Sequence, residues 1–304
     1  MQNSQLKPMN SFQVWWLAIR PKTLPAAMSG VITGSALAWH DGHFHLLLAL
    51  AALLVALLLQ IGSNLANDVF DYERGADSGP RQGPLRVTQA GLLQPRQVKG
   101  GLLLVFTLAA LCGLYLASVA GWVAIPIGAA AILAAVAYTA GPYPLGYHGL
   151  GELFVFLFFG VAAVAGTYFV QTGSVSLAAW LMSLPVGLII VGILVVNNLR
   201  DLESDKIAGK HTLAARFGSR FAKSEYLACL LGAYLSILVY CALGLLPWWS
   251  LLTWLSLPLA YATARIVFTQ TGKALNLALA RTGQLALVVS LLFLFINLPA
   301  YFIQ

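Results

Sequence analysis

The sequence predicts an all-α, polytopic membrane protein. Hydrophobic residues make up 60% of the 304 residues and charged residues only 9%, whereas charged residues make up about 25% of a typical soluble domain. Apolar runs of about 20 residues, long enough to cross a bilayer as helices, recur along the whole chain. The Lys and Arg residues are confined to alternate connections between these runs. Together these observations predict about nine transmembrane helices in a bundle around a central cavity, and we expect residues 1–304 to form a single membrane domain.

The expected spans follow the apolar runs in order. They are 12–39, 45–69, 97–118, 121–139, 152–171, 176–199, 222–243, 246–268 and 284–303. Pro21 and Pro25 interrupt the first run and Pro126 the fourth, and we expect them to bend these helices around the cavity. Asn and Asp residues end the second and sixth spans, which suggests two similar four-helix halves with a ninth helix appended. Long polar connections follow both, at 72–96 and 200–221, and we expect these loops to cap one end of the bundle.

The basic residues predict the orientation of the helices. The chain carries 17 Lys and Arg residues against 10 Asp and Glu residues, for a net charge of +7. The basic residues lie near the N-terminus and within 74–99, 200–223 and 265–281, and the connections on the other side carry none. Positive charge distributed in this way marks the cytoplasmic side of a membrane protein. We therefore expect the N-terminus and both long loops to lie in the cytoplasm, in a bacterial inner membrane, and we expect no nucleic-acid partner.

The first polar motif reads NLANDVFDYERGAD, from Asn64 to Asp77. Asn64, Asp68 and Asp71 are spaced i, i+4, i+7, which places them on one face of a helix. Asn67 lies beside them, and Asp77 follows in the loop. Polar groups next to a bilayer are costly unless they face a cavity or a partner, so we expect this face to line the cavity.

The second motif reads NNLRDLESD, and its Asn197, Asp201 and Asp205 again share one helical face. Paired carboxylates without His or Cys favour Mg²⁺, which proteins commonly share with substrate phosphates. The basic residues around the acids are Arg74, Arg81, Arg86, Arg200, Lys206 and Lys210. Mg²⁺ and basic side chains at one membrane face predict a site for a diphosphate. Two alternatives remain: the acids merely end two helices in water, or the chain is a transporter with polar groups along its path.

Five segments resemble the UbiA-type intramembrane aromatic prenyltransferases, in order and in approximate spacing. They are RPKTLPAA (20–27), SNLANDVFDYERGAD (63–77), GPLR (83–86), YTAGPYPLGYHGLGE (138–152) and NNLRDLESDKIAGKHTL (197–213). The first and last are similar to the branch that prenylates 1,4-dihydroxy-2-naphthoate in menaquinone synthesis. The resemblance implies Mg²⁺-dependent transfer of a polyprenyl group from polyprenyl diphosphate to this naphthoate, with release of diphosphate and CO₂ to give demethylmenaquinol. Another acceptor, such as 4-hydroxybenzoate or homogentisate, remains an alternative.

The resemblance also implies roles for residues at matching positions. The acids that would bind Mg²⁺ are Asp68, Asp71, Asp77, Asp201 and Asp205, and all but Asp77 would also be catalytic. Substrate contacts would come from Asn64, Asn67, Asn197, Arg20, Lys22, Arg81, Arg86 and Lys210, and Tyr138 would lie near the reacting allylic carbon. Asp77 follows Asp71 by six positions rather than the common four, and Gly146 stands near a position where some relatives carry Lys. The rings of Tyr138, Tyr143, Tyr147 and Tyr168 are candidates to stabilise an allylic cation through their π faces.

Overall fold

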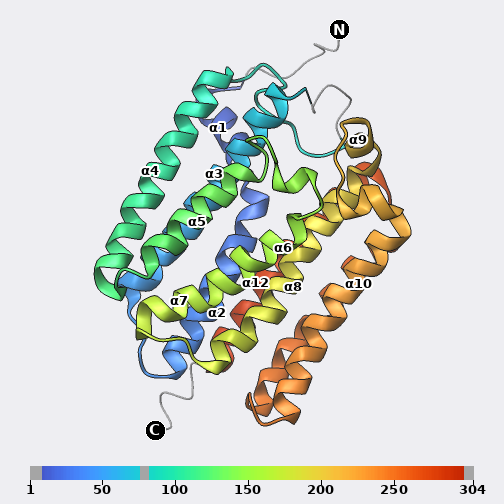
Figure 1. Ribbon diagram of the computed structural model, residues 1–304. Coiled ribbons are helices and arrows are strands. Elements are labelled where there is room, and N and C mark those ends of the chain that lie inside the picture. Colours follow the sequence, from blue (N-terminus) through green and yellow to red (C-terminus); the bar gives the residue numbers. More distant parts are fainter. Residues whose placement is uncertain (1–8, 76–81, 298–304) are drawn as a thin grey trace.

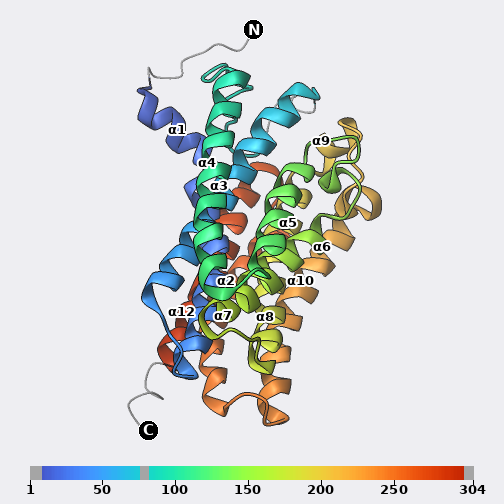
Figure 2. The same ribbon diagram turned by 60° about the vertical axis from the view of Figure 1, so that its left-hand side comes forward.

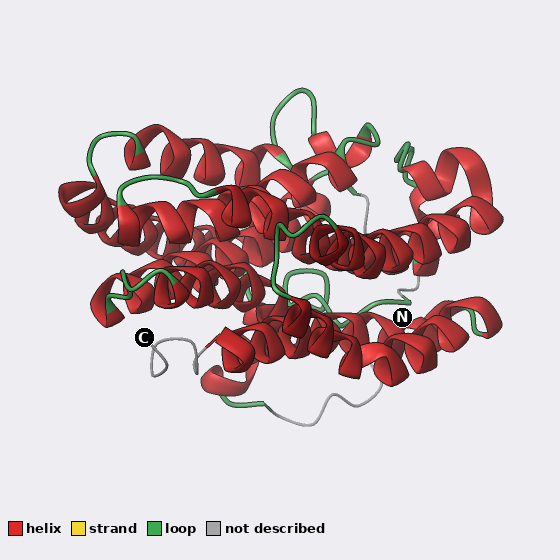
Figure 3. Cartoon of the chain, turned by 90° about the horizontal axis from the view of Figure 1, so that it is seen from below, coloured by secondary structure: helices red, strands yellow, loops and turns green. Residues whose placement is uncertain are grey.

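The computed structural model describes residues 9–75 and 82–297, and every regular element in them is helical (Figures 1 and 3). In the first part of the chain the helices are α1 (Ser11–Ile19), α2 (Leu24–His40), α3 (Leu46–Glu73), α4 (Pro95–Ala120) and α5 (Ala124–Ala137). The second part contains α6 (Gly151–Val155), α7 (Ala163–Thr172), α8 (Leu177–Arg200), α9 (Leu202–Ile207), α10 (Leu213–Ala242), α11 (Leu257–Thr269) and α12 (Leu275–Asn297). The all-α membrane fold expected from the sequence is confirmed.

Seven helical segments are long and apolar enough to cross a membrane. They are Leu46–Glu73, Pro95–Ala120, Gly151–Thr172, Leu177–Arg200, Leu213–Ala242, Trp248–Thr269 and Gly272–Asn297. The other two expected spans are shorter, since α2 has 17 residues and α5 only 14. At 1.5 Å per residue α5 is about 21 Å long, less than the roughly 30 Å of a bilayer core. The expected number of nine is therefore approximate.

The first expected span is divided in two at Arg20. This residue adopts the left-handed conformation (φ 54°, ψ 67°) that ends α1, and Pro21 then begins a short 3-10 turn before α2. Figure 2 shows α1 lying obliquely at one end of the bundle. Pro126, by contrast, is the third residue of α5. Because a first-turn residue has no intrahelical acceptor for its N–H, proline is tolerated there and the expected bend at this residue is unnecessary.

Helix α8 occupies the centre of the bundle. It packs against α10, α12 and the π-helical segment Phe156–Ala162 that joins α6 to α7. Helix α8 crosses this segment closely at Gly160 and Gly187, where a Cβ added to Gly160 would lie 2.8 Å from the Gly187 Cα. Small residues allow helices in a membrane to approach in this way. The ends of α3 and α8, with α9 beyond, consequently lie at the same end of the bundle (Figure 1).

Candidate active site

The two polar motifs meet at Lys210. Its Nζ lies 3.3 Å from Asp71 Oδ2, at the end of α3, and 3.9 Å from Asp205 Oδ1, in α9. These two carboxylates are 134 positions apart in the sequence, and one ammonium group lies close to both. Attraction to Lys210 offsets part of the repulsion between the two acids.

Asp71 is buried and receives donors from three separate loops. Arg86 Nη2 lies 2.5 Å from Asp71 Oδ2, and the Tyr147 hydroxyl donates to Asp71 Oδ1 at 2.6 Å. Burial, and next the Asp71 carboxylate, raise the pKa of Tyr147 well above its usual range, so the phenol remains a donor at neutral pH. Lys210 Nζ and Arg74 Cζ lie 4.6 and 5.6 Å from the centre of the Tyr147 ring. Tyr147 therefore fixes both the position of Asp71 and that of the cations beside it.

The second motif is organised by Arg200, which is 5% exposed. Its Nε and Nη2 donate to the two oxygens of Asp201 at 2.9 and 2.5 Å, a bidentate pair. Nη2 also donates to Asn197 Oδ1 at 2.8 Å, and Nη1 donates to Asn276 Oδ1 at 2.8 Å. Burial raises the pKa of Asp205 to about 6, against the opposing effect of the nearby Lys210 ammonium.

Asp68 differs from the other acids. Its Oδ2 accepts the backbone N–H of Val87 and its Oδ1 that of Thr88, both at 3.0 Å. The side chain is 1% exposed and is absent from the cavity lining, while Arg20 Nη2 lies 3.9 Å from Oδ2. At about 100° per residue, Asp68 is rotated roughly 60° from Asp71 around the helix axis. The face expected from the i, i+4, i+7 spacing is thus divided between a loop contact and the cavity.

The remaining residues of the first motif connect α3 to neighbouring segments. Asn64 Nδ2 donates to the Ile19 carbonyl at 2.9 Å and to Thr23 Oγ1 at 3.0 Å. Asn67 accepts two hydrogen bonds. Its backbone carbonyl accepts from Arg86 Nη1 at 2.8 Å, and its side-chain Oδ1 accepts from Thr139 Oγ1 at 3.1 Å. Both Asn64 and Asn67 still line the cavity. Asp77 and Arg81 lie outside the described residues.

A cavity of about 800 Å³ begins at this polar end and continues into the apolar part of the bundle. Of the residues expected at the site, those that line it are Arg20, Lys22, Asn64, Asn67, Asp71, Arg86, Tyr138, Asn197, Asp201, Asp205 and Lys210. Deeper in, most of the lining is apolar and includes Val31, Ala56 and Val170. A charged mouth with an apolar interior suits a ligand with an anionic head and a hydrocarbon tail.

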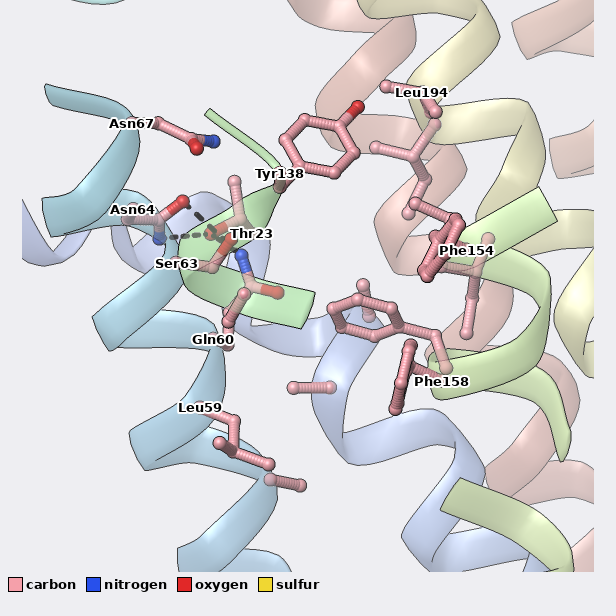
Figure 4. A pocket seen from close by; sticks show the side chains of 18 of the residues that line it. Thr23, Leu59, Gln60, Ser63, Asn64, Asn67, Tyr138, Phe154, Phe158 and Leu194 are labelled. Carbon is pink, nitrogen blue, oxygen red and sulfur yellow. Dashed lines mark hydrogen bonds between the residues drawn. The ribbon is translucent and has the colours of Figure 1, made fainter. Parts of the chain in front are cut away.

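Tyr138 lies on the wall opposite α3 (Figure 4). Its ring packs against Gly146, where an added Cβ would lie 2.7 Å from the ring, and its hydroxyl is beside Gly151. A side chain longer than that of glycine at position 146 would therefore clash with the Tyr138 ring. Burial, and next the charge of Glu152, raise the pKa of Tyr138 far above its usual range, so the phenol stays neutral.

Several residues at this site were not predicted in their observed roles. Tyr147 was expected only as an aromatic ring, and Thr23, Gln60 and Ser63 were not considered, although all line the cavity. Gln60 carried a usable signal, because it is a lone amide in an otherwise apolar run and lies one turn before Asn64.

The donor set fits Mg²⁺. The carboxylates of Asp71, Asp201 and Asp205 and the amides of Asn67 and Asn197 line one end of the cavity, and all offer the oxygen ligands that Mg²⁺ prefers. Within 9–75 and 82–297, no three carboxylate, imidazole or thiolate side chains gather closely enough to hold an ion alone. Mg²⁺ commonly uses one or two carboxylates together with waters and substrate phosphates. The site therefore fits an ion that is shared with a phosphate-bearing ligand.

Comparisons with known proteins agree with this chemistry. Residues 27–288 match the UbiA prenyltransferase family. The chain is 39% identical to 1,4-dihydroxy-2-naphthoate octaprenyltransferase of Escherichia coli (strain K12), over 92% of this chain and 94% of the relative. It is 36% identical to the Haemophilus influenzae protein of the same name, over 96% of both chains.

Solved structures share the fold at low sequence identity. A UbiA homolog from Aeropyrum pernix K1 superposes with a TM-score of 0.71 and 16% identity, covering 90% of this chain and 97% of that one. A UbiA homolog from Archaeoglobus fulgidus, bound to DMAPP and Mg²⁺, gives a TM-score of 0.66 at 14% identity, covering 95% and 99%.

Proposed function

The chain belongs to the UbiA prenyltransferase family, and we propose that it transfers a polyprenyl group from polyprenyl diphosphate to 1,4-dihydroxy-2-naphthoate in a Mg²⁺-dependent reaction. The C–O bond of the diphosphate ester breaks, a C–C bond to the aromatic ring forms, and diphosphate and CO₂ are released. The high identity to two naphthoate octaprenyltransferases, over nearly the whole chain, supports the choice of acceptor. The product is demethylmenaquinol.

The geometry of the site also supports this function. Asp71 and Asp205 approach the same ammonium group at the mouth of a cavity whose interior is apolar. This arrangement holds a diphosphate at the polar end while the hydrocarbon chain extends into the bundle. A transporter would need polar groups along its whole path, whereas most of the deeper wall of this cavity is apolar.

The basic side chains act on the leaving group. Arg86 and Lys210 already contact Asp71, so small movements bring their donors to phosphate oxygens. Positive charge held here stabilises the negative charge that develops on the departing diphosphate. Mg²⁺, when bound by the acids, adds Lewis-acid stabilisation of the same oxygens.

The aromatic wall acts on the other half of the reaction. The ring of Tyr138 faces the cavity and its hydroxyl does not ionise at neutral pH, so it offers a π face to positive charge on the allylic carbon. The apolar wall beyond it excludes water, which would otherwise compete with the aromatic acceptor.

The distribution of basic residues also indicates where in the cell the reaction takes place. The charged loops at the site end of the bundle carry the basic residues, so we place this end on the cytoplasmic face of a bacterial inner membrane. Polyprenyl diphosphate then reaches the cavity from the bilayer and the charged naphthoate from the cytoplasm.

The test uses purified protein in detergent with radiolabelled polyprenyl diphosphate. Dihydroxynaphthoate and 4-hydroxybenzoate are offered in separate reactions with Mg²⁺ or with EDTA, and Asp71→Asn is the inactive control. Prenylated naphthol that requires Mg²⁺ and Asp71 supports the proposal. Product from 4-hydroxybenzoate alone would overturn the acceptor, and Mg²⁺-independent product would overturn the role of the ion.

A further inference from the structure

A polar strip of cavity wall lies deeper in the bundle than the charged mouth. It consists of Thr23, Gln60, Ser63 and Asn64, and Figure 4 shows these side chains together on one side of the cavity. Gln60 precedes Asp71 by 11 residues, which places it roughly 16 Å farther along the axis of α3. The Gln60 amide therefore lies about three turns of α3 from the Asp71 carboxylate.

Hydrogen bonds fix the orientation of the Gln60 amide. Its Nε2 donates to Thr23 Oγ1 at 3.1 Å and to Asn64 Oδ1 at 3.3 Å. Asn64 is itself held by the Ile19 carbonyl, and Thr23 donates to the Arg20 carbonyl at 2.9 Å. Both amide protons thus have partners, and the Gln60 carbonyl points across the cavity (Figure 4). In the described part of the chain no group donates to this oxygen.

The opposite wall is aromatic. Tyr138, Phe154 and Phe158 face the polar strip across the cavity in Figure 4. Phe154 and Phe158 lie one turn apart, with ring centres 6.2 Å apart and ring planes inclined by 21° to one another. A slot with a carbonyl acceptor on one side and rings on the other suits a flat aromatic molecule that carries a hydroxyl group.

We propose that this slot binds the hydroxylated aromatic acceptor, and that Gln60 Oε1 accepts a hydrogen bond from a ring hydroxyl. The inference rests on the proposed function and assigns the acceptor half of its site. Arg20 and Lys22 line the same side of the cavity nearer the mouth, where their charge suits a carboxylate on the ring. Gln60 thereby selects an acceptor that bears a hydroxyl group at the position it faces.

The prenyl chain is a poor occupant of the polar strip. A hydrocarbon lying over the Gln60 carbonyl would leave that oxygen without water or any donor, which is unfavourable for a buried acceptor. The apolar lining that includes Val31 and Val170 offers the chain a path without this penalty. The walls of the cavity thus separate the two substrates by polarity.

The test compares Gln60→Met with the wild-type chain. Methionine keeps the length of the side chain but has no carbonyl. Thr23→Val is the second variant, since it removes the hydroxyl that orients the amide and leaves the carbonyl in place. The KM values for dihydroxynaphthoate, polyprenyl diphosphate and Mg²⁺ are measured for each protein. Inhibition constants are measured for 1-hydroxy-2-naphthoate and 4-hydroxy-2-naphthoate, each of which lacks one hydroxyl group.

Gln60→Met is expected to raise the KM for the diol by roughly 5- to 30-fold, the effect of losing one buried hydrogen bond. The KM values for diphosphate and Mg²⁺ stay unchanged, and Thr23→Val shifts the acceptor KM in the same direction by less. One of the two analogues binds both proteins equally, because it lacks the hydroxyl that Gln60 contacts.

Equal increases in the KM of both substrates would overturn the inference, as would an unchanged acceptor KM or equal weakening of both analogues. Failure of the proposed function gives a different result, since the wild-type chain would then form no prenylated naphthol. If the wild-type chain prenylates 4-hydroxybenzoate instead, the same comparison of KM values is made with that phenol. A selective rise in the KM for the phenol in Gln60→Met then supports the inference, and an unchanged KM overturns it.

Discussion

Asp68 holds a loop in this structure, and its replacement separates that role from metal binding. Both of its oxygens accept backbone N–H groups, from Val87 and Thr88, in a site that is 1% exposed. Asp68→Asn keeps one acceptor oxygen and turns an NH₂ group toward the other backbone N–H. One charge-assisted bond is lost and one buried donor is left unpaired, so we expect a local loss of about 2–3 kcal/mol.

The loop that opens carries Arg86, the residue before Val87. Hydrogen exchange measured by mass spectrometry on the wild-type protein and Asp68→Asn in detergent reports the opening directly. A loss of this size accelerates exchange of the Val87 and Thr88 amides by about 30- to 140-fold. Asp71→Asn is measured in parallel. It weakens the Arg86 contact of the same loop but leaves the Val87 and Thr88 bonds intact, so exchange of these two amides is expected to change less than in Asp68→Asn.

Terbium luminescence distinguishes the two roles in the absence of substrate. Binding of Tb³⁺ is expected to persist in Asp68→Asn and to weaken at least tenfold in Asp71→Asn, since Asp71 lines the cavity and Asp68 does not. The reasoning is refuted if Asp68→Asn abolishes Tb³⁺ binding while exchange in the loop stays at the wild-type rate.

Three other predictions concern different parts of the structure. Tyr147→Phe removes the 2.6 Å bond to Asp71, and we expect kcat/KM to fall roughly tenfold with little change in Tm; an unchanged kcat/KM would contradict the role assigned to this hydroxyl. Because the pKa of Asp205 is raised to about 6 in the folded chain, its contribution to the stability of the metal-free protein is present at acid pH and is lost as pH rises from about 4 through 6. Bound cation must displace this proton, so Tb³⁺ affinity weakens below about pH 6, and Asp205→Asn flattens both pH profiles. Gly187→Leu places a side chain against Phe156 and the Gly160 backbone. Thermal unfolding in detergent is expected to show that the free energy of unfolding falls by about 3 kcal/mol or more. Gly100 has open space around it, so the control variant Gly100→Leu leaves Tm unchanged.

The membrane helices were predictable because their signal is local. Length and apolar composition decide whether a segment crosses a bilayer, and both are visible in the sequence. The division of the first span at Arg20 was less visible, since the left-handed conformation of a non-glycine residue depends on the surrounding contacts. The short α5 shows the same limit, because its apolar run reads as a full span although its helix begins only at Ala124.

The site was predictable in part, for a related reason. Spacing alone placed Asp68 and Asp71 on one face of α3, and helical geometry allows both to line a cavity. What separates them is the backbone of Val87 and Thr88, which presents two N–H groups to Asp68 and none to Asp71. Contacts of this kind depend on the path of a loop, and no spacing rule within one helix encodes them.

In the proposed reaction one site, built from both motifs, couples prenyl transfer to loss of the acceptor carboxylate. The most direct measurement supplies dihydroxynaphthoate labelled with ¹⁴C in its carboxyl group and polyprenyl diphosphate labelled with ³H to wild-type protein, Asp71→Asn and Asp205→Asn. We expect equal amounts of ¹⁴CO₂ and ³H-labelled naphthol from wild-type protein and a parallel loss of both from each variant. Release of ¹⁴CO₂ without prenylated product, or full activity in either variant, would contradict this expectation.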